Sequence, residues 1–252
     1  MKGEQNKILN LILPVISVLV IILAWWIASA SINNNFILPS VKETMEEFFA
    51  LFLDKQFYLA FFLTFLRSFI AFIVSFALAF LLAILSNKIV CVKKAIAPII
   101  SITRALPTIA IVLLLLLWTN SSIAPVIVTM LVVFPTIYTH LYSAFCSLDK
   151  TVEEAGRVDG ANEFQVFKNI ELSQALPTIY SAIGSGISLN FKLMVAAEVI
   201  SQTANSIGYM LNTSKVYFET AQMLAIVCSS VILGVIIEAV FNVLSKKAGE
   251  WR

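Results

Sequence analysis

The chain has 252 residues, of which 60% are hydrophobic and only 13% are charged, and its formal net charge is +2. Soluble globular proteins carry about 45–50% apolar and about 25% charged residues, so this composition argues against a soluble enzyme or a disordered protein. The small net charge gives no reason to expect a nucleic-acid partner. The three cysteines form no CxxC pair, so neither a metal site nor a disulfide framework is expected. Long charge-poor runs indicate an all-α integral membrane protein in a lipid bilayer.

Six long apolar stretches predict about six transmembrane helices. They cover approximately residues 8–30, 57–86, 95–118, 122–147, 176–204 and 220–245. Each stretch can cross a bilayer core of about 30 Å at about 1.5 Å per residue, and a helix pairs all its backbone groups internally. The first stretch follows Lys2 and Lys7 and resembles a signal peptide. It is longer than the apolar region of about 7–15 residues in a signal peptide, so we expect an uncleaved helix.

The distribution of lysine and arginine predicts that both termini are cytoplasmic. If the N-terminus lies inside, eleven basic residues fall on the cytoplasmic side. Only Lys42, Lys55 and Lys215 fall on the outer side, in agreement with the positive-inside rule. We therefore expect a single transmembrane domain over residues 1–252.

A short amphipathic helix is predicted over residues 40–53, outside the membrane after the first span. Ser40 and Glu43 have the spacing of a capping box. One face carries the apolar residues, which are Val41, Met45, Phe48, Phe49 and Phe52. Because the other face is acidic rather than basic, we expect this helix to pack on the bundle. Further along the chain, Pro107 and Pro135 are expected to kink the third and fourth spans.

The segment 148–176 is polar and longer than most connections, which indicates structure or function of its own. Helix-forming residues run from Val152 to Val158, and Gly160 interrupts them. Asn162 and Gln165 then have capping-box spacing for a second short helix. Its apolar residues recur about once per turn, and these are Phe164, Phe167 and Ile170. The segment either caps its own bundle or presents apolar side chains to a groove on a partner.

The same segment resembles the EAA loop of binding-protein-dependent ABC importer permeases. The positions that carry the resemblance are Glu154, Ala155, Gly160, Ile170 and Leu172. Two positions depart from the pattern, because Gly156 replaces its second alanine and Ser173 replaces its proline. Supporting similarities to the nitrate, sulfonate and taurine branch cover roughly residues 36–245. They include Phe36 to Ser40, Thr64 to Phe69, Arg104 to Pro107 and Val195 to Glu198.

The resemblance implies a MetI-like type I importer permease in the bacterial cytoplasmic (inner) membrane. Its partners would be a second permease subunit in a homodimer, two cytoplasmic ATPases and an extracytoplasmic solute-binding protein. The ATPase-coupling residues would be Glu154, Ala155, Gly160, Ala161, Phe164, Phe167, Ile170 and Leu172. The chain lacks a phosphate-binding glycine-rich loop, so ATP and Mg would be bound and ATP hydrolysed by the partner ATPase. We expect no catalytic residue, cofactor or metal in the chain itself. The solutes that the resemblance suggests are sulfonates, taurine, nitrate and thiamine-precursor pyrimidines.

Five charged residues interrupt the apolar stretches, and these are Arg67, Arg104, Lys192, Glu198 and Glu238. Charges at membrane depth normally face the bundle interior or water. Arg67, Arg104, Lys192 and Glu198 are therefore candidates for the solute pathway, where the excess of cations suits an anion. The alternative is internal pairing, for instance of Arg67 or Lys192 with Glu198.

Small residues in the fifth stretch are expected to let helices pack closely, and these are Ala182, Ser185 and Gly186. Two other classes of protein were weighed against the permease. A secondary transporter without an ATPase also needs buried charge, but it usually shows internal repeats, which the sequence lacks. An intramembrane serine protease needs an activated serine near a histidine, and Ser185 with His140 lacks a GxSG motif.

Overall fold

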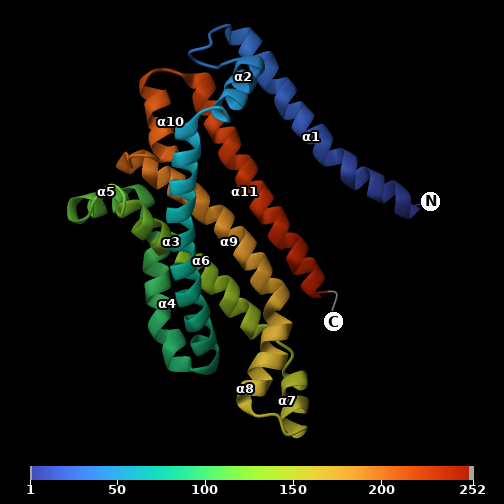
Figure 1. Cartoon of the computed structure of the whole chain (residues 1–252). Helices are drawn as coiled ribbons and strands as arrows, with labels where there is room; N and C mark the ends of the chain where they lie inside the picture. The colour runs from blue at the N-terminus through green and yellow to red at the C-terminus, as the bar shows by residue number, and fades with distance from the viewer. Residues whose placement is uncertain (1, 250–252) are drawn as a thin grey trace. The chain divides into compact units, whose positions relative to one another are not determined.

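A computed structural model describes the backbone of residues 2–249 and the side chains of residue 13 and residues 16–247. All elements within this range are helices, which confirms the all-α prediction. The chain forms two compact units (Figure 1). One contains the residues up to Tyr58 together with Met210–Ser229, and the other contains Leu59–Tyr209 together with the residues from Ser230 onward. The expectation of a single domain stays a prediction.

The first unit contains α1, Lys2–Ile32, and α2, Val41–Leu51. The Ser40 hydroxyl accepts a hydrogen bond from the backbone N–H of Glu43, whose carboxylate accepts one from the N–H of Ser40. This capping box fixes the start of α2, as the sequence predicts for residues 40–53. The apolar face is covered only in part, and the residues that remain exposed are Met45, Phe49 and Phe52.

Among the residues that the structure describes, four segments are long and apolar enough to cross a membrane. They are α3 (Lys55–Lys88), α6 (Ala124–Cys146), the segment Glu163–Ser201, and the segment Thr220–Lys247. The third of these ends in α9, Leu172–Ser201, and the fourth lies in α11, Thr220–Gly249. The first predicted span, 8–30, falls on α1, whose described side chains form a shorter apolar helix over Ile16–Ile32. The first predicted span, 8–30, and the cytoplasmic position of the termini therefore stay predictions.

The third predicted span, over residues 95–118, is broken at Pro107, where the sequence predicted a kink. Two helices, α4 (Val90–Ala105) and α5 (Thr108–Trp118), meet at an angle of 96° and count as one span only if the bend is included. Pro107 has no N–H for a helical hydrogen bond, and its ring disfavours the helical conformation of Leu106. Leu106 is accordingly extended, with φ −71° and ψ 128°. Pro135, in contrast, lies inside α6, which continues as one helix.

The core of the second unit forms around α9, which packs most extensively on α6. A Cβ built on Gly186 would come within 3.1 Å of Phe72 on α3 and 3.3 Å of Ile137 on α6. A Cβ built on Gly184 would come within 2.5 Å of Phe241 on α11. The small residues of α9 therefore let three neighbouring helices approach its backbone closely.

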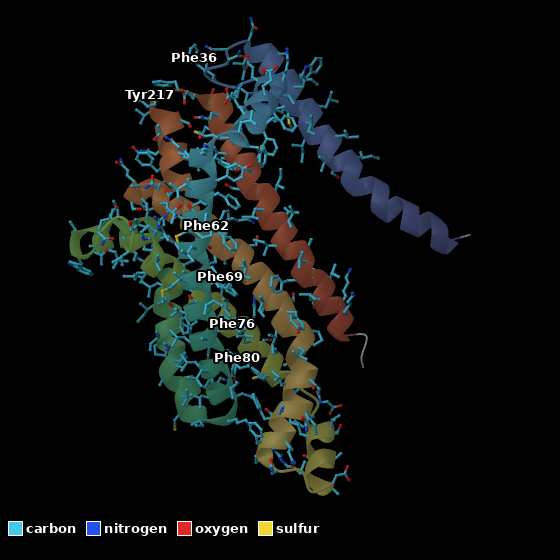
Figure 2. All side chains as sticks on the ribbon, viewed as in Figure 1. Phe36, Phe62, Phe69, Phe76, Phe80 and Tyr217 are labelled. Carbon is cyan, nitrogen blue, oxygen red and sulfur yellow. The ribbon has the colours of Figure 1, made fainter. Side chains whose placement is uncertain are left out.

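Phenylalanines follow α3 along its length, as Figure 2 shows for Phe62, Phe69, Phe76 and Phe80. Phe62 and Phe69 are exposed, whereas Phe76 and Phe80 pack against the core. The two inner rings stack with centroids 5.9 Å apart. One helix thus supplies both the apolar outer surface and part of the core, as expected for a helix that spans a membrane.

Contrary to the prediction, the loop 148–176 does not separate the second short helix from the following span. The chain is helical without interruption from Glu163 to Ser201, through α8 (Glu163–Gln165), a π-helical turn η1 (Val166–Glu171) and α9. Ser173, which replaces the proline of the EAA pattern, lies inside this continuous helix. Pro177 therefore lies inside α9 instead of at its entrance.

A further helix, α10 (Ile207–Val216), lies where an outer loop was predicted. The Ser206 hydroxyl accepts a hydrogen bond from the backbone N–H of Tyr209 at 2.9 Å and donates one to the carbonyl of Thr203 at 2.7 Å. Ser206 therefore acts as an N-cap. A serine before an apolar residue was the local signal that could have predicted this helix.

Candidate coupling segment and intramembrane polar cluster

The coupling segment consists of α7 (Lys150–Val158), the turn that follows it, α8 and η1. Asp149 caps α7, because its carboxylate accepts two hydrogen bonds from Thr151. The Thr151 hydroxyl donates one at 2.6 Å, and the Thr151 backbone N–H donates the other at 2.9 Å. These two hydrogen bonds from Thr151 favour the charged form and hold the pKa of Asp149 below its usual value. The first helix of the segment thus begins at a defined residue.

Gly160 makes the turn between the two short helices. Its φ is +85°, a conformation that side chains disfavour, and nothing lies within 4 Å of a Cβ built there. Asn162 and Gln165 then form the predicted capping box. Across the turn, the Arg157 guanidinium donates to both carboxylate oxygens of Glu163 at 3.0 and 3.3 Å, which raises the pKa of Arg157. The backbone conformation of Gly160, the capping box at Asn162 and the ion pair between Arg157 and Glu163 together stabilise the turn.

The predicted coupling residues divide into two groups. Glu154, Ala155, Gly160 and Phe164 are exposed, and Phe164 has 70% of its surface accessible. The partly buried group consists of Ala161, Phe167, Ile170 and Leu172. Phe167 and Leu172 pack against the core, so Phe164 is the aromatic residue that the segment presents outward.

Gly156, where the sequence departs from the EAA pattern, faces the second short helix. A Cβ built on this glycine would meet Cδ1 of Ile170 at 2.5 Å. The glycine therefore allows α7 to lie close to η1 in the present arrangement of Ile170. An alanine at position 156 requires the flexible end of the isoleucine side chain to move.

A buried carboxylate joins the coupling segment to α3. Glu171, the last residue of η1, is 4% exposed, and its Oε1 lies 3.5 Å from the Nζ of Lys88. The same ammonium lies 5.3 Å from the centroid of the Phe167 ring. Phe167 in turn stacks on Phe145 of α6, with centroids 6.5 Å apart. Lys88 and Glu171 are far apart in the sequence, which gave no sign of their pairing.

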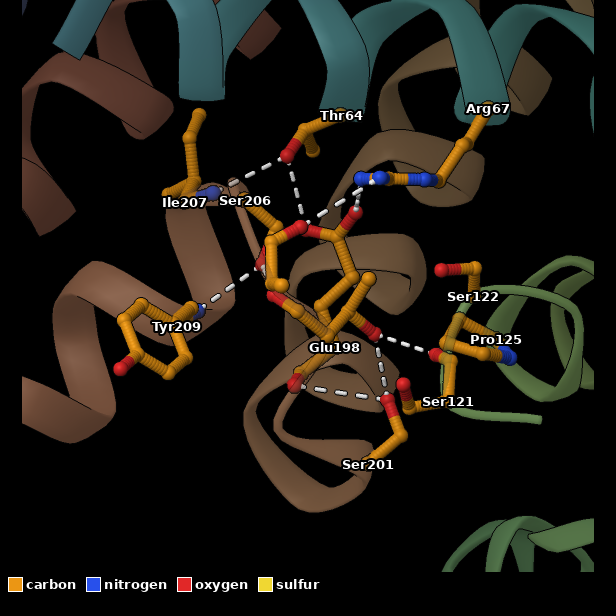
Figure 3. Close-up of polar contacts among 12 residues, drawn as sticks. Thr64, Arg67, Ser121, Ser122, Pro125, Glu198, Ser201, Ser206, Ile207 and Tyr209 are labelled. Carbon is orange, nitrogen blue, oxygen red and sulfur yellow. Dashed lines mark hydrogen bonds and ion pairs between the residues drawn. The ribbon is translucent and has the colours of Figure 1, made fainter. Parts of the chain in front are cut away.

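The intramembrane cluster is centred on Glu198 of α9, whose side chain is fully buried. Figure 3 shows the groups that surround its carboxylate. The Thr64 hydroxyl donates to Oε2 at 2.8 Å, and Nη1 of Arg67 donates to Oε1 at 3.0 Å. The Thr64 oxygen also accepts the backbone N–H of Ile207 at 3.0 Å. The cluster therefore ties α3, α9 and the start of α10 together.

A second chain of hydrogen bonds continues beyond Glu198 (Figure 3). The backbone N–H of Thr203 donates to the Glu198 carbonyl at 3.2 Å. The Thr203 hydroxyl donates to the Ser121 carbonyl at 2.5 Å and lies 2.7 Å from the Ser201 hydroxyl. The end of α9 is thereby held to the turn that precedes α6.

The structure places the four pathway candidates in different surroundings. Arg67 and Glu198 form an ion pair, so the alternative of internal pairing applies to them. Arg104, in the last turn of α4, donates to the hydroxyl of Thr139 at 2.7 Å. Lys192 is exposed, and among the described residues it has neither an ion pair nor a hydrogen bond. Arg104 and Lys192 are thus the two candidate cations that no described carboxylate neutralises.

Several residues of these sites were not predicted from the sequence. They are Thr64, Lys88, Val158, Glu171, Asn190 and Gly208. Val158 is 86% exposed at the end of α7, and the amide of buried Asn190 donates to the hydroxyl of Ser68 at 2.6 Å. Val158 has a local signal, because it is an apolar residue beside the predicted turn. The buried contacts depend on which helices are neighbours, which a single sequence does not show.

The broken span, the long apolar helices and the buried charge cluster define a polytopic α-helical membrane protein. Residues 75–250 match the family described as "Binding-protein-dependent transport system inner membrane component". This match covers more than half of the chain, and the chain therefore belongs to that family. The resemblance seen in the EAA-like segment is confirmed at the level of the family.

Two solved structures share the fold. A chain from "Crystal structure of an amino acid ABC transporter with histidines" has a TM-score of 0.65 at 15% identity, over 81% of this chain and 96% of that chain. A chain of the MetNI methionine ABC transporter in an inward-facing conformation has a TM-score of 0.62 at 16% identity, over 74% and 93%. These similarities confirm the predicted permease fold.

Three curated relatives share between 22% and 25% sequence identity with the chain. The riboflavin transport system permease protein RibX of Chloroflexus aurantiacus is 22% identical over 63% of this chain and 59% of its own length. The taurine transport system permease protein TauC of Escherichia coli is 24% identical over 64% and 58%. The putative aliphatic sulfonates transport permease protein SsuC of the same organism is 25% identical over 60% and 58%. The match thus spans about three fifths of the length of each relative.

Proposed function

We propose that this chain is the permease subunit of an ABC importer and forms the solute pathway across the bacterial cytoplasmic membrane. The observation that carries the proposal is the family match together with the geometry of the coupling segment. In that segment, α7 and α8 are joined by a glycine turn and present exposed Phe164 beside them. An exposed aromatic residue on a short helix suits a groove on a partner protein.

The proposed partners follow from the same family. Two copies of this chain form a homodimer around the pathway, and two ATPases bind ATP and Mg and carry out hydrolysis. Each ATPase binds one coupling segment through the exposed residues Glu154, Ala155, Gly160 and Phe164. A solute-binding protein delivers the solute on the opposite side. Because helix continues from Glu163 to Ser201, motion of the coupling segment passes directly into a membrane span.

For the solute, we propose a small organic or inorganic anion, such as a sulfonate, taurine or nitrate. Two relatives named for taurine and aliphatic sulfonates support this class. Arg104 and Lys192 support it independently, because they supply positive charge at membrane depth without a described carboxylate partner. Arg67 does not add to this charge, since Glu198 neutralises it. A thiamine-precursor pyrimidine is the other solute class that the family suggests.

Reconstitution tests the proposal. The chain is purified with the ATPase and the binding protein encoded beside it and is placed in vesicles. Uptake of a labelled sulfonate should require all three proteins and ATP. Uphill uptake by the chain alone would instead identify a secondary transporter. Uptake only of solutes that carry no anionic group would refute the anion class and leave the importer function intact.

A further inference from the structure

A charged cavity of about 440 Å³ lies beside the coupling segment in the second unit. It is bounded by the end of α3, the end of α6, α7 and η1. The charged residues of its wall are Lys88, Lys150, Glu153, Arg157, Glu163 and Glu171. Three are cations and three are carboxylates, so the wall as a whole has no net charge. One of these six groups, the carboxylate of Glu171, differs from the others because it is buried.

Glu171 is the buried charge of this wall, with 5% of its side chain exposed. Its Oε1 faces Lys88, whose side chain is 40% exposed and is therefore partly in water. Its Oε2 is buried and has no hydrogen-bond partner among the described residues. Buried polar atoms in folded proteins nearly always have a partner, so an unpartnered oxygen on a residue that lines a cavity indicates a missing donor.

The neighbouring charges of the wall do not supply that donor. Arg157 is committed to Glu163 through two hydrogen bonds. A metal ion does not fit, because no group of three histidine, cysteine or acidic residues suited to a metal occurs among the residues described. At about 440 Å³ the cavity also has room for a long side chain as well as for waters, each of which occupies roughly 30 Å³. A cationic donor at the end of a long side chain from another protein matches both the size of the cavity and the negative charge of Glu171.

We propose that a lysine or arginine side chain of the ATPase enters this cavity and donates to Oε2 of Glu171. This inference rests on the proposed function. The ATPase is the occupant because α7 and α8, which it would contact through Phe164, also form the wall of the cavity. Glu171 thereby becomes a binding residue behind the exposed coupling surface. It links the partner to the continuous helix Glu163–Ser201 at the residue that directly precedes α9.

Two substitutions separate this role from a purely internal one. Glu171→Gln keeps the shape of the side chain and removes its charge, whereas Lys88→Met removes the internal partner and leaves both carboxylate oxygens free. If Glu171 receives a cation of the ATPase, Glu171→Gln weakens ATPase binding at least about tenfold, as expected on loss of one partner of a buried charge pair. Lys88→Met then leaves binding unchanged or makes it tighter.

The affinity is measured between the ATPase and the chain in nanodiscs of phosphatidylglycerol, which contain no lipid amine that could occupy the cavity. Size-exclusion profiles and thermal unfolding confirm that each variant is folded, and Glu171→Asp, which retains the charge, should bind better than Glu171→Gln. Equal weakening by Glu171→Gln and Lys88→Met, or full binding by Glu171→Gln, would overturn the inference. Failure of the unmodified chain to bind any ATPase would instead overturn the proposed function.

Discussion

Gly208 lies against the backbone of Glu198, so closely that a Cβ on the glycine would come within 2.5 Å of the Val199 nitrogen. Backbone atoms cannot move aside as the end of a side chain can. Only glycine therefore lets the start of α10 reach α9 at the level of the buried carboxylate. Glu198, whose backbone Gly208 approaches, is also the residue whose carboxylate pairs with Arg67.

The first prediction concerns this glycine. Gly208→Ala should lower the free energy of unfolding by about 1–3 kcal/mol, the usual cost of overpacking a filled site. The measurement is thermal unfolding in detergent, followed by circular dichroism. Gly234→Ala is the matched control, because in the described part of the chain its Cβ would meet no backbone atom within 4 Å, but only two side-chain atoms, the Ser188 hydroxyl at 3.3 Å and Cε of Lys192 at 3.8 Å. A similar loss of stability in both variants would contradict the proposed close approach.

The second prediction concerns the buried ion pair. Arg67→Met leaves the Glu198 carboxylate buried without its cation and should cost about 3–5 kcal/mol of stability. The double variant with Glu198→Gln should be more stable than the sum of the two single changes implies, since it removes both charges. Lys192→Met is the control, because this lysine has no described partner, and we expect a change within about 0.5 kcal/mol. Additive effects of the two single changes would show that the pair is not coupled.

The third prediction separates two phenylalanines of the coupling segment. Phe167 packs against the core, so Phe167→Ala should destabilise the fold by about 2 kcal/mol, less than the 3–5 kcal/mol of a fully buried phenylalanine. Phe164→Ala should leave the unfolding temperature unchanged, because the side chain is mostly exposed. It should nevertheless abolish co-purification with the ATPase. Loss of stability in Phe164→Ala would place this ring inside the fold.

The fourth prediction concerns Gly160. Its positive φ favours glycine and its surroundings are open, so any penalty comes from the backbone alone. Gly160→Val should cost about 1–2 kcal/mol within the segment, and Gly160→Asn should cost less, because asparagine tolerates positive φ. Spin labels on α7 and α8 would report the distance between the two helices. An unchanged distance and unchanged transport in Gly160→Val would show that the turn does not need this conformation.

The fifth prediction concerns pH. The hydrogen bonds from Thr151 depress the pKa of Asp149 in the folded state, so the cap stabilises α7 fully above the unfolded pKa of about 3.9. This contribution is lost as the pH falls through the lower, folded pKa. Spin-label mobility on α7 should therefore increase only under acid conditions. Asp149→Asn retains a capping side chain without titration and should remove this step.

The length of the apolar stretches predicted most of the spans, because a helix that crosses the bilayer needs an apolar segment as long as the bilayer core is thick. The capping boxes at Ser40 and Asn162 were also predictable, since the cap and its partner are only three residues apart. A bend at Pro107 was predicted, but its extent was not, because a proline can either kink a helix or break it. Pro107 breaks its helix, whereas Pro135 lies within one.

Of the two ion pairs with a buried carboxylate that the described residues form, the sequence suggested one and gave no sign of the other. Pairing of Arg67 with Glu198 could be offered as an alternative, because both charges stand out within apolar sequence. Pairing of Lys88 with Glu171 could not, since both residues lie in polar segments where charges are common. It requires the end of α3 to lie beside η1, which is a result of helix packing.

The unbroken helix from Glu163 to Ser201 gives the molecule a lever arm. At about 1.5 Å per residue its 39 residues extend roughly 58 Å, so tilting it by about 5° around its midpoint displaces each tip by about 2.5 Å in opposite directions. Phe164 stands near one tip and Glu198 near the other. If the helix tilts as a rigid body, a displacement of Phe164 in one direction moves Glu198, and the guanidinium of Arg67 paired with it, in the opposite direction.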